Sequence, residues 1–151
     1  MVYINMDATT GVMQGWYFGG SGEDSAIAVV ADNDGWIYSL GNGYSVEFTA
    51  GTIDCFLVRY SQSGTMDYLM SFGGRNPDFA ADMKIKDTSV IILGHSQSSE
   101  LSQGFLDIFI AAAYKHDPSV NFWSRYIGTP SFSEYAYSLA VSQEGYIFAM
   151  G

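Results

Sequence analysis

An internal repeat is the feature that most constrains the fold of this chain. The tripeptide Phe18-Gly19-Gly20 recurs as Phe72-Gly73-Gly74 and, in a looser form, as Tyr126-Ile127-Gly128, with 54 residues from each copy to the next. After the two glycines, the first unit continues with Asp24, an alanine-containing segment, a Gly-aromatic segment that ends in Gly41, and then Asp54-Cys55-Phe56. The second unit repeats this order. A period of this length, with four short strand patterns per unit and no helical period, is typical of β-propeller blades.

The strand patterns predict an all-β, propeller-type repeat of four-stranded antiparallel blades, which we denote a to d. The chain holds about three blades' worth of strands: two whole blades and one blade divided between the two ends of the chain. We expect a single repeat domain, 1–151, made of segments 1–18 (strands c and d), 19–72, 73–127 and 128–151 (strands a and b). The expected strands are 2–6, 12–18, 26–32, 36–41, 54–60, 66–72, 80–86, 89–94, 107–114, 121–127, 136–142 and 146–151.

Side-chain size predicts the order of the strands within a blade. The a-strands are rich in alanine, as expected near a crowded central axis, so we place them innermost. The d-strands carry large aromatic residues such as Trp16 and Trp123 and are expected at the perimeter. Continuously apolar middle strands such as Val90-Ile91-Ile92-Leu93 indicate sheets that are covered on both faces.

Charge and composition exclude several classes of partner. The chain has 16 acidic and 6 basic residues, and its net charge of −10 opposes binding to nucleic acid and to anionic membranes. No apolar run reaches the 18 residues of a membrane span, and Met1 to Asp7 lack the pattern of a secretory signal, so we expect no membrane insertion. The single Cys55 lies in an apolar run and is expected to be a buried small hydrophobe. These features leave the cellular compartment undetermined.

The order of these motifs resembles the SBBP family, the seven-bladed β-propeller repeat. The resemblance rests on Gly-Gly, Asp, the alanine-rich strand, the Gly-aromatic strand and Asp-x-Phe, and it covers essentially the whole chain. It implies a propeller fold and favours an extracellular or cell-surface protein without an assigned reaction. The third unit departs from the pattern, because Gly128-Thr129-Pro130 replaces Gly-Gly and residues 131–133 lengthen the approach to Glu134.

The chain shows no motif for catalysis, for a cofactor or for a metal ion. Asp32-Asn33-Asp34-Gly35 resembles the start of a calcium loop, but the matching segments of the other units carry Lys86 and Ser142, so we interpret it as a turn. His95 and His116 lack a second ligand nearby, and Gly19 to Gly22 precede a strand rather than the helix of a phosphate loop. Acids recur once per blade at strand entrances and are expected to fix loops through backbone N–H groups; they are Asp24, Asp54, Asp78 and Asp107.

The long loops between strands b and c are the candidate binding site, because loops of one kind emerge on one face of a propeller. The candidate binding residues are Asn42, Tyr44, Glu47, His95, Gln97 and Glu100. Their mixture of hydroxyl, amide, aromatic and carboxylate groups suits a protein surface or a glycan. We therefore expect a noncatalytic interaction or scaffold module. The alternative is a polysaccharide-active propeller enzyme with carboxylates near the channel.

Three blades' worth of strands is too few for a closed ring, since closed propellers have roughly 4 to 8 blades. Two arrangements would complete the divided blade. The missing strands come either from a longer polypeptide of which this chain is a part, or from head-to-tail association of two chains into a six-bladed ring.

Overall fold

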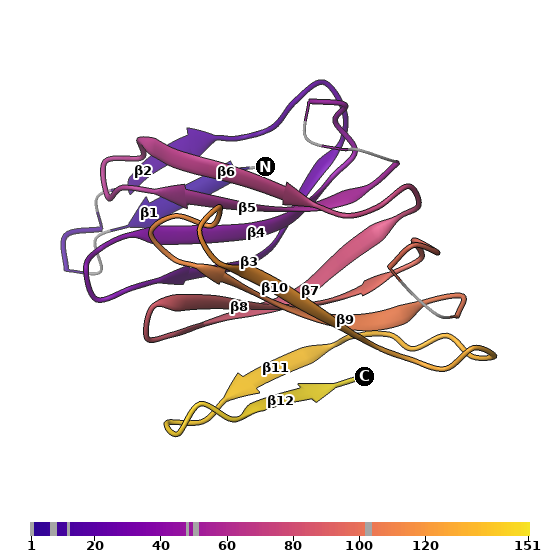
Figure 1. Cartoon of the computed structure of the whole chain (residues 1–151). Coiled ribbons are helices and arrows are strands. Elements are labelled where there is room, and N and C mark those ends of the chain that lie inside the picture. Colours follow the sequence, from indigo (N-terminus) through magenta and orange to yellow (C-terminus); the bar gives the residue numbers. More distant parts are fainter. Residues whose placement is uncertain (1, 7–8, 12, 48, 50–51, 102–103) are drawn as a thin grey trace.

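The computed structural model describes residues 2–6, 9–11, 13–47, 49, 52–101 and 104–151 (Figure 1). These residues form β-strands, turns and loops, without a helix. The predicted strand ranges are confirmed to within two residues at each end. The strands are β1 (Val2–Met6), β2 (Met13–Tyr17), β3 (Asp24–Ala31), β4 (Ile37–Gly43), β5 (Asp54–Tyr60), β6 (Met66–Phe72), β7 (Asp78–Lys86), β8 (Ser89–Ser96), β9 (Asp107–Tyr114), β10 (Phe122–Ile127), β11 (Ser138–Val141) and β12 (Ile147–Met150).

The strands form two antiparallel four-stranded sheets and two antiparallel hairpins. The first sheet has the order β3-β4-β5-β6 and the second the order β7-β8-β9-β10, while β1 pairs with β2 and β11 pairs with β12. We call the four-stranded sheets blade 1 and blade 2. This confirms the predicted all-β repeat of four-stranded antiparallel blades, with half a blade at each end.

The blades stack through their first strands. Strand β7 contacts β3 on one side and β11 on the other, so the three alanine-rich strands are neighbours in the stack. The main core cluster joins blade 1 to blade 2 and includes Tyr38, Leu40, Met83 and Ile92. Strand β4 is buried along its whole length, as expected for a middle strand covered on both faces. Trp123 lies on the outer strand β10 and is 37% exposed, in agreement with its predicted place at the perimeter; the side chain of Trp16 lies outside the described residues.

The structure corrects the alignment of the third repeat by one residue. Phe72 pairs with Cys55 in blade 1, and the corresponding pair in blade 2 is Ile127 with Ile108. The two glycines that follow occupy equivalent places, because a Cβ atom at Gly73 would meet the carboxylate of Asp54 and one at Gly128 would meet that of Asp107. The third copy of the motif is therefore Ile127-Gly128-Thr129, and the Tyr126-Ile127-Gly128 alignment is wrong.

Candidate functional site

The loops that precede strands a and c emerge together on one side of the stack, on the right in Figure 1. We call this the loop side and define it by the described residues of segments 18–23, 44–53, 73–77, 97–106 and 128–137. The short turns between strands a and b and between strands c and d lie on the opposite, turn side. The predicted b–c loops of blades 1 and 2 therefore do lie on the same side of the molecule.

Three side chains of blade 1 hold the glycine loop that enters it. Asp24, Ser45 and Glu47 accept hydrogen bonds from the successive backbone N–H groups of residues 20–22. The donor–acceptor distances are 2.8 Å for Gly20 N to Asp24 Oδ2, 3.2 Å for Ser21 N to Glu47 Oε2 and 3.0 Å for Gly22 N to Ser45 Oγ. The Ser45 hydroxyl in turn lies 2.8 Å from Asp24 Oδ2. We call this arrangement the Asp-Ser-Glu clasp.

Blade 2 repeats the clasp with Asp78, Ser98 and Glu100. The distances are 2.6 Å for Gly74 N to Asp78 Oδ2, 2.7 Å for Arg75 N to Glu100 Oε1 and 3.1 Å for Asn76 N to Ser98 Oγ. Asp78 and Ser98 are buried, at 1% and 0% exposure. The third unit keeps one part of the clasp, since Glu134 accepts a bond from Thr129 N at 3.4 Å. The prediction that Asp24 and Asp78 fix loops through backbone N–H groups is confirmed.

Hydrogen bonds and burial in the clasps shift the pKa values of Glu47, Glu100 and Asp78. The pKa of Glu47 is lowered by hydrogen bonds from the backbone N–H group of Glu47 and from Ser21. The pKa of Glu100 is lowered in the same way by hydrogen bonds from the backbone N–H group of Glu100 and from Arg75. Burial raises the pKa of Asp78 despite its hydrogen bonds, and the nearby carboxylate of Asp54 adds to the effect. Glu47 and Glu100 are thus anionic at neutral pH and already engaged with the backbone.

Two further predicted site residues join neighbouring blades. Asn42, at the end of β4, accepts a hydrogen bond from Ala80 N in β7 at 2.7 Å. His95, at the equivalent place in β8, accepts one through Nδ1 from Ala136 N at 3.4 Å, and its ring lies between the rings of Phe79 and Tyr135. Burial lowers the pKa of His95, which keeps the ring neutral and able to accept. Both side chains act as ties between blades.

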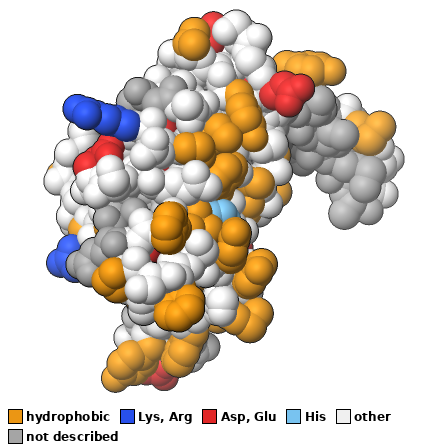
Figure 2. Space-filling view, turned by 90° about the vertical axis from the view of Figure 1, so that its right-hand side faces the viewer, with side chains coloured by type: hydrophobic (Ala, Val, Ile, Leu, Met, Phe, Trp, Pro, Cys, Tyr) orange, Lys and Arg blue, Asp and Glu red, His pale blue; other side chains and the backbone are white. Residues whose placement is uncertain are grey.

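The other two predicted residues, Tyr44 and Gln97, are exposed on the loop side, Tyr44 by 46%. Large apolar residues of the loop side are more exposed: Val46 by 79% and Phe105 by 76% on the same two loops, and Phe132 by 71% on the loop between β10 and β11. Figure 2, which views this side, shows hydrophobic side chains gathered in a band that runs from the top to the bottom of the face. Sequence reasoning missed these apolar residues because it looked for polar groups in the loops.

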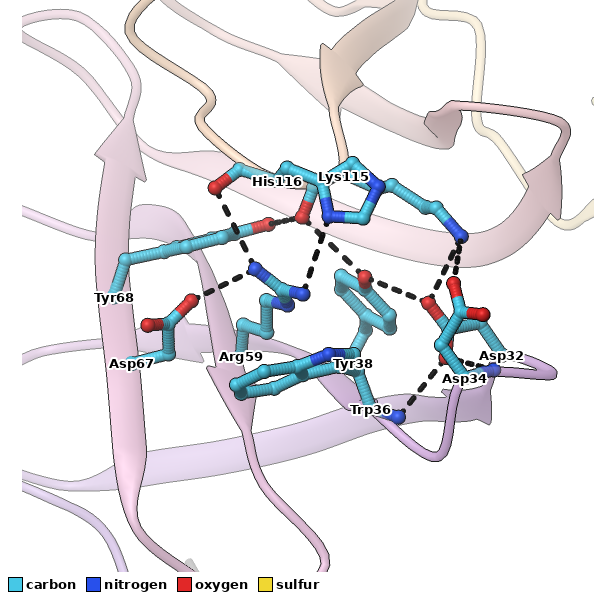
Figure 3. A network of polar contacts seen from close by, with 9 residues as sticks. All are labelled: Asp32, Asp34, Trp36, Tyr38, Arg59, Asp67, Tyr68, Lys115 and His116. Carbon is cyan, nitrogen blue, oxygen red and sulfur yellow. Dashed lines mark hydrogen bonds and ion pairs between the residues drawn. The ribbon is translucent and has the colours of Figure 1, made fainter.

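The turn side carries a separate polar network, drawn in Figure 3. Lys115 Nζ in blade 2 lies 3.1 Å from Asp32 Oδ2 and 3.1 Å from Asp34 Oδ2 in blade 1. Asp32 also accepts hydrogen bonds from Asp34 N, from Trp36 N and from the Tyr38 hydroxyl. Burial favours a raised pKa for Asp32, but the bonds from Trp36, Lys115 and Tyr38 together hold it below 3.8. The predicted turn is confirmed, and its cationic partner is an ammonium group.

Arg59 extends this network towards the outer strands. Its guanidinium lies 3.7 Å from the centre of the Trp36 ring and its Nη1 lies 2.8 Å from Asp67 Oδ2. The same guanidinium lies 3.5 Å from the backbone carbonyl of His116 in blade 2. The arginine side chain is buried, so the network fastens the turn sides of the two blades to each other.

A cavity of about 170 Å³ lies between the two blades, behind the glycine loop at residues 73–76. Four aromatic residues line it, together with Asp78 and small or aliphatic residues. The lining includes Phe72, Asp78, Leu101, Phe109, Phe122 and Tyr126. Cys55 is fully buried, as predicted, and burial raises the pKa of its thiol well above the usual range.

No family model matches the chain, and no curated protein matches it significantly. Among the described residues, no group of three or more His, Cys, Asp and Glu side chains could hold a metal ion. The described part of the chain also has no helix long and apolar enough to cross a membrane. The geometry of the loop side is therefore the basis for a functional proposal.

Proposed function

We propose that the chain is a noncatalytic interaction module of the β-propeller type, related to the SBBP repeats, whose loop side docks a protein or a glycan. One observation carries the proposal: large apolar side chains are exposed on the loops of the loop side, and two of these loops also supply the serine and the glutamate of the clasps. Tyr44, Val46, Phe105 and Phe132 are 46 to 79% exposed, whereas Ser45 and Ser98, on two of the same loops, are buried and accept hydrogen bonds from Gly22 N and Asn76 N.

Loops that are held by hydrogen bonds favour binding, because less conformational entropy is lost when a ligand docks. Exposed aromatic rings supply contact area for either kind of ligand, since they stack on sugar rings and pack into apolar pockets of proteins. The net charge of −10 favours a neutral or basic partner over an acidic one. Exposed polar residues of the loop side, such as Gln97, would orient the ligand.

The test compares the wild-type chain with a double variant, Phe105→Ser with Phe132→Ser. Native gels that contain soluble polysaccharides (a β-glucan, a xylan or a mannan) detect glycan binding, and selection from a random peptide library detects binding of a protein segment. Tyr146→Ser is the matched control, because Tyr146 is 68% exposed but lies in an a–b turn on the turn side.

We expect retardation or peptide selection for the wild type and for the control, and a loss of at least about tenfold in affinity for the double variant, as for the loss of aromatic anchor residues. Gel retardation identifies the ligand as a glycan, and selected peptides identify it as a protein. Equal binding by all three proteins, or binding by none, would contradict the proposal.

A further inference from the structure

The C-terminal hairpin β11–β12 has the sequence and the place of strands a and b of a blade. Gly41, Gly94 and Gly151 are equivalent, because a Cβ atom at each would meet a backbone carbonyl oxygen in or just before the neighbouring a-strand, at residue 25 in β3, residue 79 in β7 and residue 135 before β11. Strand β12 therefore corresponds to β4 and β8, the fully covered middle strands of blades 1 and 2.

The side chains of β12 are exposed at positions where the equivalent side chains of β4 and β8 are buried. With the three glycines aligned, Met150 corresponds to Leu40 and Leu93, and Phe148 corresponds to Tyr38 and Ile91. The four residues of the complete blades are 0 to 6% exposed, whereas Phe148 is 60% and Met150 is 62% exposed. The outer edge of β12 also lacks the c-strand that β4 and β8 pair with.

The N-terminal hairpin β1–β2 has the place of strands c and d. The ring of Phe18, just after β2, packs 5.3 Å from the ring of Phe56, as the ring of Phe72, at the end of β6, packs 5.9 Å from the ring of Phe109. Since β2 therefore corresponds to β6, its partner β1 corresponds to β5 and β9. Figure 1 shows the two hairpins on opposite sides of the two blades, so each half-blade lies far from its complement within one chain.

We propose that β12 of one chain pairs with β1 of a second copy, so that the two hairpins complete one blade. The two hairpins are complementary, since β1–β2 has the place of strands c and d and β11–β12 has that of strands a and b, which is why a second copy fits. Two such junctions related by a twofold axis give a closed ring of six blades.

The complete blades fix the register of this pairing. Gly41 pairs with Phe56 and Ile37 with Tyr60, and the equivalent pairs of blade 2 keep the same register. When the β1–β2 pair is aligned with the β5–β6 pair, β1 takes the place of β5 and Val2 takes the position of Phe56. The proposed junction therefore pairs Gly151 with Val2, Ala149 with Ile4 and Ile147 with Met6.

The face of the second copy that would cover Phe148 and Met150 is also incomplete. Val29 in β3 corresponds to Met83 in β7, since both lie opposite equivalent residues of their b-strands, Ser39 and Ile92. Met83 is fully buried against blade 1, whereas Val29 is 58% exposed. The second copy would thus bury apolar surface on both chains, beyond the strand pairing itself.

Cysteine cross-linking tests the register. The double variant Ile4→Cys with Ala149→Cys places the two thiols opposite each other across the junction, within the Cα separation that a disulfide spans. Tyr3→Cys with Ala149→Cys is the matched control, one residue out of register and facing the other side of the sheet. Cys55 stays unchanged because it is fully buried.

We expect the wild-type chain at micromolar concentration to have twice the mass of one chain by light scattering, and mild oxidation to cross-link the first variant but not the control. Met150→Asp should raise the dimer dissociation constant at least about tenfold and keep the β-type circular dichroism. Met66→Asp, at a 50% exposed position on β6, should leave the dimer intact.

A wild-type mass of one chain would overturn the proposal, as would polydisperse aggregation, or a dimer that both cysteine variants cross-link equally or neither cross-links. The loop side is not altered by any of these variants, so loss of ligand binding by Phe105→Ser with Phe132→Ser would not affect the result.

Discussion

At the scale of single residues, Lys115 is the charged residue whose removal we expect to destabilise the fold most clearly. We predict that Lys115→Met lowers the free energy of unfolding by about 3 kcal/mol, since the Asp32 carboxylate, with a side chain only 3% exposed, would lose its cationic partner. The matched control Lys86→Met removes an ion pair to an exposed aspartate and should cost less than about 1 kcal/mol. Urea unfolding of the three proteins at pH 7 measures both effects.

The pH dependence of this effect has a defined sign. The folded-state pKa of Asp32 is depressed, so its contribution to stability is present above the unfolded value of 3.8 and is lost as the pH falls through the folded value. The difference between wild type and Lys115→Met should therefore shrink below about pH 4. A constant difference between pH 7 and pH 3 would show that the lysine stabilises the blade by packing and not by its charge.

His95 gives a second prediction at the residue scale. Because burial depresses the pKa of His95, its contribution to stability is present above pH 6.5, its unfolded value, and is lost as the pH falls through the folded value. His95→Asn places the residue of the equivalent blade-1 tie, Asn42, at this position and keeps an acceptor for Ala136 N. The urea midpoint of the variant should fall less than that of the wild type between pH 7.5 and pH 5.5. An equal fall of the urea midpoint in the two proteins would mean that His95 protonates in the folded state without breaking its hydrogen bond to Ala136 N.

At the scale of structural elements, we expect the clasps to stabilise the loop side. Ser98→Ala should lower the free energy of unfolding by about 1 to 2 kcal/mol, because Asn76 N loses its acceptor and buried Asp78 loses a donor. Ser99→Ala, at the exposed neighbouring position, should change it by less than about 0.5 kcal/mol. Thermal or urea unfolding measures the difference, and amide exchange at residues 74–76 should rise only in Ser98→Ala. Equal stabilities would mean that water replaces the hydroxyl in the clasp.

The elements themselves could be predicted from the sequence because their signals are local. Apolar runs and the turns around Gly35 and Gly145, which have φ of +83° and +92°, mark where strands begin and end. The clasps could be predicted only in part. The recurrence of Asp24 and Asp78 once per blade predicts that they fix loops, whereas the loop positions of Glu47 and Glu100 predict exposed binding groups and give no sign of bonds to the backbone. Their partners are backbone N–H groups about 25 residues away, and no sequence pattern reports such a contact.

The misaligned third repeat has a related cause. Tyr126 matches Phe72 as a side chain, but the position is defined by the glycine whose missing Cβ makes room for the carboxylate of Asp54 or Asp107. Side-chain similarity and backbone geometry disagree there by one residue, and only the strand register resolves the difference. The ties made by Asn42 and His95 were likewise hidden, since the two side chains share the ability to accept a hydrogen bond but little else.

At the scale of the whole molecule, the stack should have a gradient of local stability from its middle to its ends. The amides of β4, β8 and β9 lie between paired strands in buried sheets and should exchange slowest with deuterated solvent, whereas β12 is an edge strand with exposed side chains. If two chains complete each other's divided blade, protection at β12 and β1 must rise with protein concentration, while exchange at β8 stays the same. Hydrogen exchange read by mass spectrometry at about 1 and about 100 µM separates these cases, because mass action moves only the equilibrium between free and paired ends. Fast exchange of β12 at both concentrations would mean that the half-blade stays open, and that the interior character of Phe148 and Met150 serves a partner other than a second copy of this chain.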